Sequence, residues 1–202
     1  MNQQPAIIWD LGNVLVDWSP RYLYNKIFSD PKERDWFLDE VCSMEWHNGV
    51  DSGRPVTEAT DELIQKHPGL AHPIKAFYAR WKEMFQGSIS GSVEILAELR
   101  TKGYRQYALT NWSAELFEQS RGDFPFLEWF DGIVISGAEG LTKPDPRIYL
   151  RLLERYALHA EHCLFIDDKT ANVEAAQRLR MDGIHFRNPE GLRRDLALRS
   201  LL

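Results

Sequence analysis

The sequence predicts an α/β fold: a Rossmann-like parallel sheet with helices on both faces, into which an α-helical cap domain is inserted. Short apolar runs recur along the chain and each ends at polar residues, which is typical of strands buried on both faces. Amphipathic helical patterns separate these runs, and strands that alternate with helices form parallel sheets. One long stretch, from about residue 18 to residue 86, contains helical patterns but no strand-like run, which indicates an insert.

The expected strands follow from the apolar runs. The first run covers residues 6–9 and ends at Asp10 and Gly12. Further runs of the same kind cover residues 104–109, 132–135, 162–166 and 183–186. Helical patterns lie between them, and the second of these opens with Asp145-Pro146, an N-cap residue followed by proline at the first helical position. We expect these helices at about residues 93–103, 145–156, 172–180 and 192–202.

The insert is predicted to be entirely helical. Proline and glycine residues punctuate its apolar patterns and divide it into separate short helices. The segment 87–92 is rich in glycine and serine and is expected to be a flexible linker back to the sheet. We therefore predict a core domain of residues 1–17 and 88–202 and a helical cap domain of residues 18–87. Within the cap, the helical patterns cover residues 21–28, 31–41, 57–66 and 74–85.

The composition narrows the class of protein. The 202 residues carry a formal net charge of −6 and no basic run, so we expect neither nucleic acid nor an anionic membrane as a partner. Cys42 and Cys163 are too few and too far apart for a disulfide scaffold or a zinc site. Residues 1–10 contain no lysine or arginine and are not typical of a signal peptide. We expect a cytoplasmic protein.

Residues suited to phosphate chemistry follow the predicted strands. Asp10 follows the first strand, Thr110 the second, and Asp167 and Asp168 the fourth, while Lys143 lies after the third. The carboxyl ends of parallel strands meet at one edge of a sheet, where ligands bind. A carboxylate can attack phosphorus, Mg²⁺ prefers hard oxygen ligands, and lysine or hydroxyl donors neutralise charge on phosphoryl oxygens. These residues predict a site for Mg²⁺-assisted phosphate chemistry.

Four segments resemble the four motifs of the haloacid dehalogenase-like hydrolase superfamily. They are Asp-Leu-Gly-Asn-Val-Leu at 10–15, Leu-Thr-Asn at 109–111, Lys-Pro-Asp at 143–145 and Phe-Ile-Asp-Asp at 165–168. The position of the insert is similar to that of members with a helical cap after the first strand. Most members are Mg²⁺-dependent phosphatases, and a minority cleave carbon–halogen bonds. The first segment is similar to a branch that includes sugar-1-phosphate phosphatases.

The resemblance implies a metal site around the first strand. Asp10 would be the nucleophile and one ligand of Mg²⁺, the backbone carbonyl of Gly12 a second ligand, and Asp168 a third. Asp167 and Asn172 would act beside the metal.

The resemblance also implies a set of residues that bind the substrate. Thr110 and Lys143 would act with Asp10 in catalysis, and both would hold the phosphate together with Asn111. Gly12 and Asn13 would also contact the substrate.

One position departs from the usual phosphatase pattern. The second residue after the nucleophile is normally an aspartate that protonates the leaving group, but here it is Gly12, which cannot transfer a proton. His47 in the cap is a candidate for the missing acid and for a substrate contact, with the alternative that it is a surface residue. Trp46 and Asp51 could line the same cleft, whereas Trp46 could also pack in the cap core.

The sequence therefore predicts a Mg²⁺-dependent hydrolase of small phosphate monoesters that acts through an aspartyl-phosphate, with sugar 1-phosphates as candidate substrates. The expected partner is a small phosphorylated metabolite. Two alternatives remain open. The first is a metal-independent 2-haloacid dehalogenase, which would use the same aspartate. The second is a non-catalytic phosphoacceptor or binding protein, since receiver domains also gather aspartates, a hydroxyl and a lysine at a sheet edge.

Overall fold

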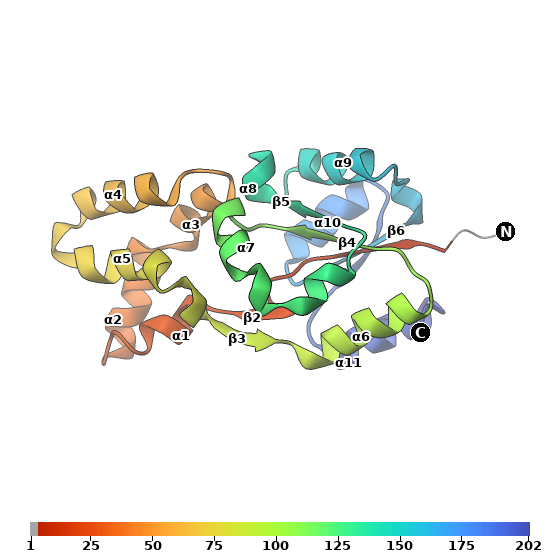
Figure 1. The fold of residues 1–202 in the computed structure, drawn as a ribbon, viewed down its shortest axis with the longest axis horizontal. Coiled ribbons are helices and arrows are strands. Elements are labelled where there is room, and N and C mark those ends of the chain that lie inside the picture. Colours follow the sequence, from red (N-terminus) through yellow and green to blue (C-terminus); the bar gives the residue numbers. More distant parts are fainter. Residues whose placement is uncertain (1–3) are drawn as a thin grey trace.

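The computed structural model describes residues 4–202 and confirms the predicted α/β fold. A five-stranded parallel sheet has the strand order β5-β4-β1-β6-β7, and a helical cap extends from one end of it (Figure 1). The strands of this sheet are β1 (Ala6–Trp9), β4 (Gln106–Thr110), β5 (Gly132–Ile135), β6 (Cys163–Asp167) and β7 (Asp182–His185).

Burial on both faces explains the unbroken apolar run of β1. Ile7 and Trp9 pack into one hydrophobic cluster, which includes side chains of α6 and α11, and Ile8 packs into a second cluster with side chains of α9 and α10. Successive strand residues point to opposite faces, so a strand covered on both sides needs apolar residues throughout. The helices of the core domain are α6 (Ser90–Thr101), α7 (Ala114–Ser120), α8 (Ser136–Glu139), α9 (Pro146–Arg155), α10 (Thr170–Arg178) and α11 (Pro189–Leu198).

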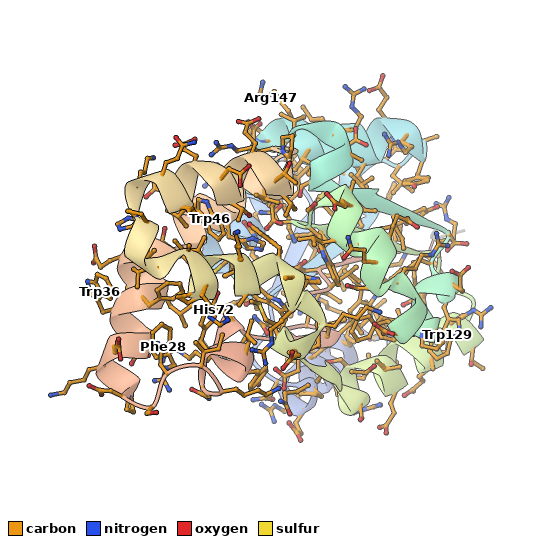
Figure 2. All side chains as sticks on the ribbon, turned by 60° about the vertical axis from the view of Figure 1, so that its left-hand side comes forward. Phe28, Trp36, Trp46, His72, Trp129 and Arg147 are labelled. Carbon is orange, nitrogen blue, oxygen red and sulfur yellow. The ribbon has the colours of Figure 1, made fainter. Side chains whose placement is uncertain are left out.

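The cap consists of short helices, as Figure 1 shows. Trp46 lies among them (Figure 2), where its indole N–H donates to the Ala59 carbonyl and its ring packs edge-on against Phe77. Trp46 therefore packs in the cap core. The helices are α1 (Pro20–Tyr24), α2 (Pro31–Trp36), a π-helical turn (Phe37–Val41), α3 (Met44–Asp51), α4 (Val56–Lys66) and α5 (Ala71–Ala79).

The connection between cap and core differs from the prediction. The segment 87–92 is not a flexible linker: β3 (Phe85–Ser88) pairs antiparallel with β2 (Val16–Trp18), and α6 begins at Ser90. The pairing gives hydrogen-bond partners to the backbone groups of both segments that connect the cap to the core. A glycine- and serine-rich segment alone would have no partner strand for these groups. The cap thus joins the core through a two-stranded ribbon, and the domain boundaries at residues 17/18 and 87/88 remain a prediction.

Two helices of the cap end several residues earlier in the structure than the sequence predicted. The helix expected over residues 21–28 ends at Tyr24, and the one expected over 74–85 ends at Ala79 before a 3₁₀ turn, η3 (Trp81–Met84). Among the described residues, no helix is both long and apolar enough to span a membrane.

Candidate active site

Asp10 and Lys143 meet at the carboxyl edge of the sheet. Trp9 pairs with Ala108 of β4 and with Ile166 of β6, so Asp10 follows at the level of Leu109 and Asp167. Lys143 Nζ lies 2.8 Å from Asp10 Oδ1 and donates to the Leu109 carbonyl, also at 2.8 Å. Both charged side chains are buried. The structure thus brings together the predicted nucleophile and the predicted phosphate-binding lysine, which lies in the loop between α8 and α9.

Asp167 holds its neighbours in place. Its Oδ2 lies 2.7 Å from Lys143 Nζ, and the Asn172 amide donates to both of its carboxylate oxygens at 2.9 and 3.0 Å. The backbone N–H of Lys169 donates to Oδ1 at 2.8 Å. Asp167 is completely buried, and a buried charge needs such partners to be tolerated. Its carboxylate therefore orients Lys143 and Asn172.

Three carboxylates form a group that suits a metal ion. Asp10, Asp167 and Asp168 each offer an oxygen within 4.8 Å of the others. Carboxylate oxygens are the ligands that Mg²⁺ prefers, whereas zinc and copper sites in proteins generally include sulfur or imidazole. The donor set therefore fits Mg²⁺.

Electrostatics at this edge favour a cation. The pKa of Asp10 is raised to about 7, because burial and the charge of Asp167 together outweigh the opposite effect of Lys143. Burial and the neighbouring Asp167 also raise the pKa of Asp168. Burial opposes the charge on Lys143, but Asp10 and Asp167 outweigh it and raise its pKa. A divalent cation would stabilise the charged form of each carboxylate.

Thr110 and Asn111 of the second motif both line the cavity, and Asn111 also supports Lys143. Thr110 is buried at the end of β4 and lines the cavity. The Asn111 side chain accepts from the Lys143 N–H at 2.8 Å and donates to the Lys143 carbonyl at 2.9 Å. The Asn111 side chain thus fixes the loop that carries the lysine.

The loop after β1 shapes the floor of the cavity. The backbone N–H of Leu11 donates to Asp10 Oδ1 at 2.7 Å. Asn13 adopts a left-handed conformation, with φ of 57°, and its side chain accepts from the Trp18 N–H at 3.3 Å. A Cβ placed on Gly12 would meet no atom within 4 Å, so the position of the usual aspartate is open space.

His47 lines the cavity from α3 and is buried, so it is not a surface residue. Its Nδ1 lies 3.1 Å from the Tyr78 hydroxyl, and its Nε2 lies 3.6 Å from Asp51 Oδ2. Burial lowers the pKa of His47, which favours the neutral ring. A neutral imidazole is a much weaker proton donor than the imidazolium ion, so His47 is poorly suited to replace the missing acid.

Asp51 joins the cap to the core. Its Oδ1 accepts from the Ser113 N–H at 3.0 Å, and its backbone carbonyl accepts from the Ser136 hydroxyl at 2.5 Å. The sequence singled out Asp51 only as a cleft residue, because the two serines lie more than 60 positions away along the chain. The sequence also missed the aromatic residues of the cavity, which no local motif connects.

These features define a capped α/β hydrolase. The site beneath the helical cap combines an aspartate in the nucleophile position, a buried lysine and a carboxylate group that suits Mg²⁺. The chain belongs to the haloacid dehalogenase-like hydrolase family, whose sequence model matches residues 5–180. It is 29% identical to a sesquiterpene phosphatase of Aspergillus oryzae, over 90% of this chain and 89% of that one.

Two solved structures have the same fold. A Bacteroides thetaiotaomicron enzyme of this family, solved as an Asp-to-Ala mutant with magnesium and inorganic phosphate, superposes with a TM-score of 0.71 at 20% identity, covering 92% of this chain and 95% of that one. The L-2-haloacid dehalogenase of Xanthobacter autotrophicus superposes with a TM-score of 0.64 at 15% identity, covering 99% of this chain and 85% of that one. The fold is therefore compatible with both chemistries, and the site has to distinguish them.

Proposed function

We propose that the protein is a Mg²⁺-dependent phosphatase that hydrolyses small phosphate monoesters through an aspartyl-phosphate on Asp10. The observation that carries this proposal is the carboxylate group of Asp10, Asp167 and Asp168 around Lys143. A phosphate dianion needs several positive charges beside it, and this group attracts them. A haloacid substrate carries a single negative charge and gives no purpose to three clustered carboxylates.

The proposed reaction has two steps. A carboxylate oxygen of Asp10 attacks phosphorus, the bond from phosphorus to the ester oxygen breaks, and that oxygen leaves with the electron pair and takes up a proton. Water then attacks phosphorus and loses a proton to solvent, the bond from phosphorus to Asp10 breaks with its electron pair returning to the carboxylate, and phosphate leaves. Lys143 Nζ, already 2.8 Å from Asp10, neutralises charge that develops on the phosphoryl oxygens. Thr110 donates a hydrogen bond to the same oxygens.

The metal would be held by Asp10, the Gly12 carbonyl and Asp168. When bound, Mg²⁺ supplies positive charge that stabilises the phosphoryl oxygens in the transition state. Asp167 and Asn172 support this arrangement from behind, because the Asp167 oxygens are engaged by Lys143 and by the Asn172 amide.

The likeness to a sesquiterpene phosphatase along nearly its whole length supports phosphatase activity. The substrate of this chain is a small phosphorylated metabolite in our proposal. The sugar 1-phosphates suggested by the first motif remain a prediction, and the cavity lining described below argues for a less polar leaving group.

The deciding experiment is a panel of phosphate monoesters assayed with Mg²⁺ and with excess chelator, beside 2-chloropropionate. We expect ester hydrolysis that requires Mg²⁺ and is abolished in Asp10→Asn and in Asp168→Asn. Asp61, exposed on α4, is the matched control, and Asp61→Asn should retain full activity. Dehalogenation that survives chelator would overturn the proposal.

The same panel tests the phosphoacceptor alternative. If no ester is hydrolysed, acetyl phosphate treatment followed by mass spectrometry will show whether Asp10 keeps a phosphoryl group for hours. A long-lived adduct would indicate a receiver-like protein, whereas the phosphatase predicts rapid turnover.

A further inference from the structure

The cavity above Asp10 has two chemically different ends. It has an empty volume of about 660 Å³, which includes open solvent at its mouth. Its core end is polar and includes Asp10, Thr110, Lys143 and Asp168. Its cap end is largely apolar. A phosphate monoester has the same division, since the phosphoryl group is charged and the leaving group differs between substrates.

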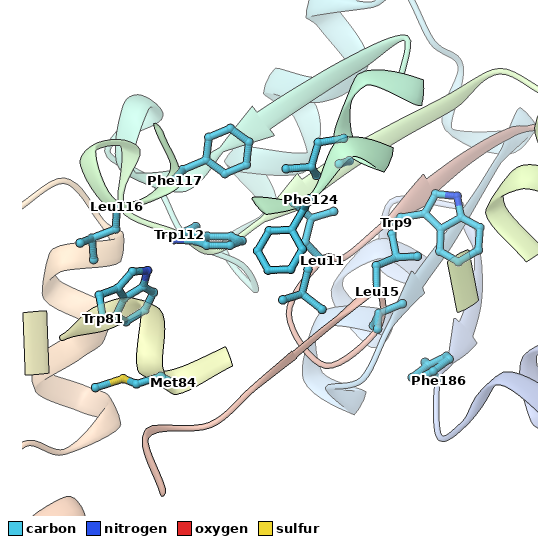
Figure 3. Close-up of a cluster of buried hydrophobic side chains, with 14 of the residues drawn as sticks. Trp9, Leu11, Leu15, Trp81, Met84, Trp112, Leu116, Phe117, Phe124 and Phe186 are labelled. Atoms are coloured by element: carbon cyan, nitrogen blue, oxygen red, sulfur yellow. The ribbon is translucent and has the colours of Figure 1, made fainter. Parts of the chain in front are cut away.

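Four aromatic side chains form the apolar end, and we call them the aromatic wall: Trp18, Trp81, Phe85 and Trp112. The ring centroids lie 5.5 Å apart for Trp18 and Trp81, 5.6 Å for Trp81 and Phe85, and 5.7 Å for Phe85 and Trp112. Figure 3 shows Trp81 and Trp112 as neighbours. The wall is therefore a continuous aromatic surface.

The mouth of the cavity extends this apolar surface. Met44 lines the cavity from the first turn of α3 and is 41% exposed, although most large apolar side chains of the chain are buried. An exposed flexible thioether beside an aromatic surface provides an adaptable contact for a hydrophobic ligand.

Few polar groups of the cap end are available to a substrate. His47 and Asp51 line the cavity, but His47 Nδ1 lies 3.1 Å from the Tyr78 hydroxyl and Asp51 accepts from the Ser113 N–H. Asn48 also lines the cavity and is exposed, so its amide can contact a substrate. Within residues 4–202, the buried indole N–H groups of Trp18 and Trp112 have no hydrogen-bond partner. These groups only donate. The leaving group of a sugar phosphate carries several hydroxyls, and each hydroxyl hydrogen that finds no acceptor lowers the affinity.

We propose that the active site selects phosphate monoesters with a hydrophobic leaving group, such as an aryl or long alkyl group, and discriminates against polyhydroxylated ones. This inference rests on the proposed phosphatase function. The phosphate lies at the polar end beside Asp10 and Lys143, and the leaving group lies against the aromatic wall.

The test must separate hydrophobic contact from leaving-group acidity. A series of n-alkyl phosphates from methyl to octyl has nearly constant acidity, so we expect KM to fall about fourfold for each added methylene until the wall is covered. Cyclohexyl phosphate should also have a lower KM than glucose 1-phosphate, although the sugar is the better leaving group. A KM that is independent of chain length would overturn the inference.

Variants locate the effect. Trp18→Ala should reduce the ratio of hexyl to methyl phosphate kcat/KM at least tenfold. Trp129, half-buried in the core on the side away from the cap (Figure 2), provides the control, and Trp129→Phe should leave the ratio unchanged.

A binding measurement on the unaltered protein keeps the two proposals distinct. Alkylphosphonates cannot be hydrolysed, and their binding can be followed by tryptophan fluorescence or calorimetry. Phosphonate affinity that rises with chain length, without hydrolysis of any ester, would refute the phosphatase and uphold hydrophobic selection. Hydrolysis with flat KM values and flat phosphonate affinities would refute hydrophobic selection and uphold the phosphatase. Neither hydrolysis nor graded binding would refute both.

Discussion

Replacing Gly12 with aspartate should install the general acid that the site lacks. The position lies two residues after Asp10 and lines the cavity. A new Cβ there meets no atom within 4 Å, and Gly12 is not among the residues with positive φ, so an aspartate fits without strain. The parent protein must expel its leaving group as the oxyanion or with a proton from solvent. Substrates with poor leaving groups suffer most from this.

The size of the gain follows from the value of a positioned acid. General acid catalysis contributes about 10²–10⁴-fold, and a newly placed carboxyl will realise the lower part of that range. We expect Gly12→Asp to raise kcat/KM for hexyl phosphate at least tenfold and to change kcat/KM for p-nitrophenyl phosphate less than threefold, at Mg²⁺ saturation.

The assay is kcat/KM across esters of graded leaving-group acidity. In the parent, log kcat/KM should fall steeply as the leaving group becomes less acidic, and in Gly12→Asp the slope should approach zero. Gly12→Asn is the matched control, because it has the same shape but no acidic proton. An equal response to Asp and Asn, or a parent series that is already flat, would show that another group supplies the proton.

Three further predictions concern the thiols, the metal and the packing of the cap against the core. Burial raises the pKa of Cys42 to about 12 and that of Cys163 to about 11, so both thiols stay neutral at pH 8 and should react with a disulfide reagent more than about a hundredfold slower than in the denatured chain. Saturating Mg²⁺ should raise the melting temperature, since at a hundred times its Kd a ligand adds about 2.7 kcal/mol, and Asp168→Asn should remove most of that gain. Gly137→Ala should lower stability by about 1–3 kcal/mol, because its Cβ would lie 2.6 Å from the Ala114 nitrogen.

Each of these has a direct control. Rapid thiol labelling of the native protein at pH 8 would contradict the burial of both cysteines. For the metal, the melting temperature is also measured with Ca²⁺ in place of Mg²⁺ and with sodium chloride at equal ionic strength. An equal rise with these salts would indicate general screening of acidic charge and not a specific Mg²⁺ site. Gly122→Ala, at an exposed glycine whose Cβ would meet no atom, should change stability far less than Gly137→Ala in urea unfolding.

The sheet could be predicted because its strands carry their own signal. An apolar run such as Ala6–Trp9 is required by burial on both faces, and it ends at Asp10, where the strand ends. The ribbon of β2 and β3 carried no such signal. Gly87 and Ser88 form a strand only because Val16 and Asp17, far away in sequence, offer backbone partners.

Helix α3 was missed for a similar reason. Its sequence contains Asn48 and Gly49, which favour the helix weakly. The Ser43 side chain caps it by accepting from the Trp46 N–H, and burial of Val50 holds its inner face. Tertiary contacts here outweigh local propensity, and only the folded chain reveals them.

The catalytic end of the site could be predicted from the sequence, whereas the end that would bind the leaving group could not. Asp10, Thr110 and Asp167 lie at strand ends, and parallel topology alone brings them together. The aromatic wall comes from segments separated by as many as 94 residues, from Trp18 to Trp112, and no spacing rule connects them.

This distribution ties recognition of the leaving group to the docking of the cap. Trp18 and Phe85 lie in the ribbon and Trp81 lies in the turn before it, whereas Trp112 follows a core strand. The wall is therefore complete only while the cap rests on the core. The contact from Asp51 to the Ser113 N–H holds that position. Separating the cap from the core would break this hydrogen bond, expose Asp51 to water and divide the aromatic surface. The same contact that encloses the cavity thus completes the surface on which a hydrophobic leaving group would bind.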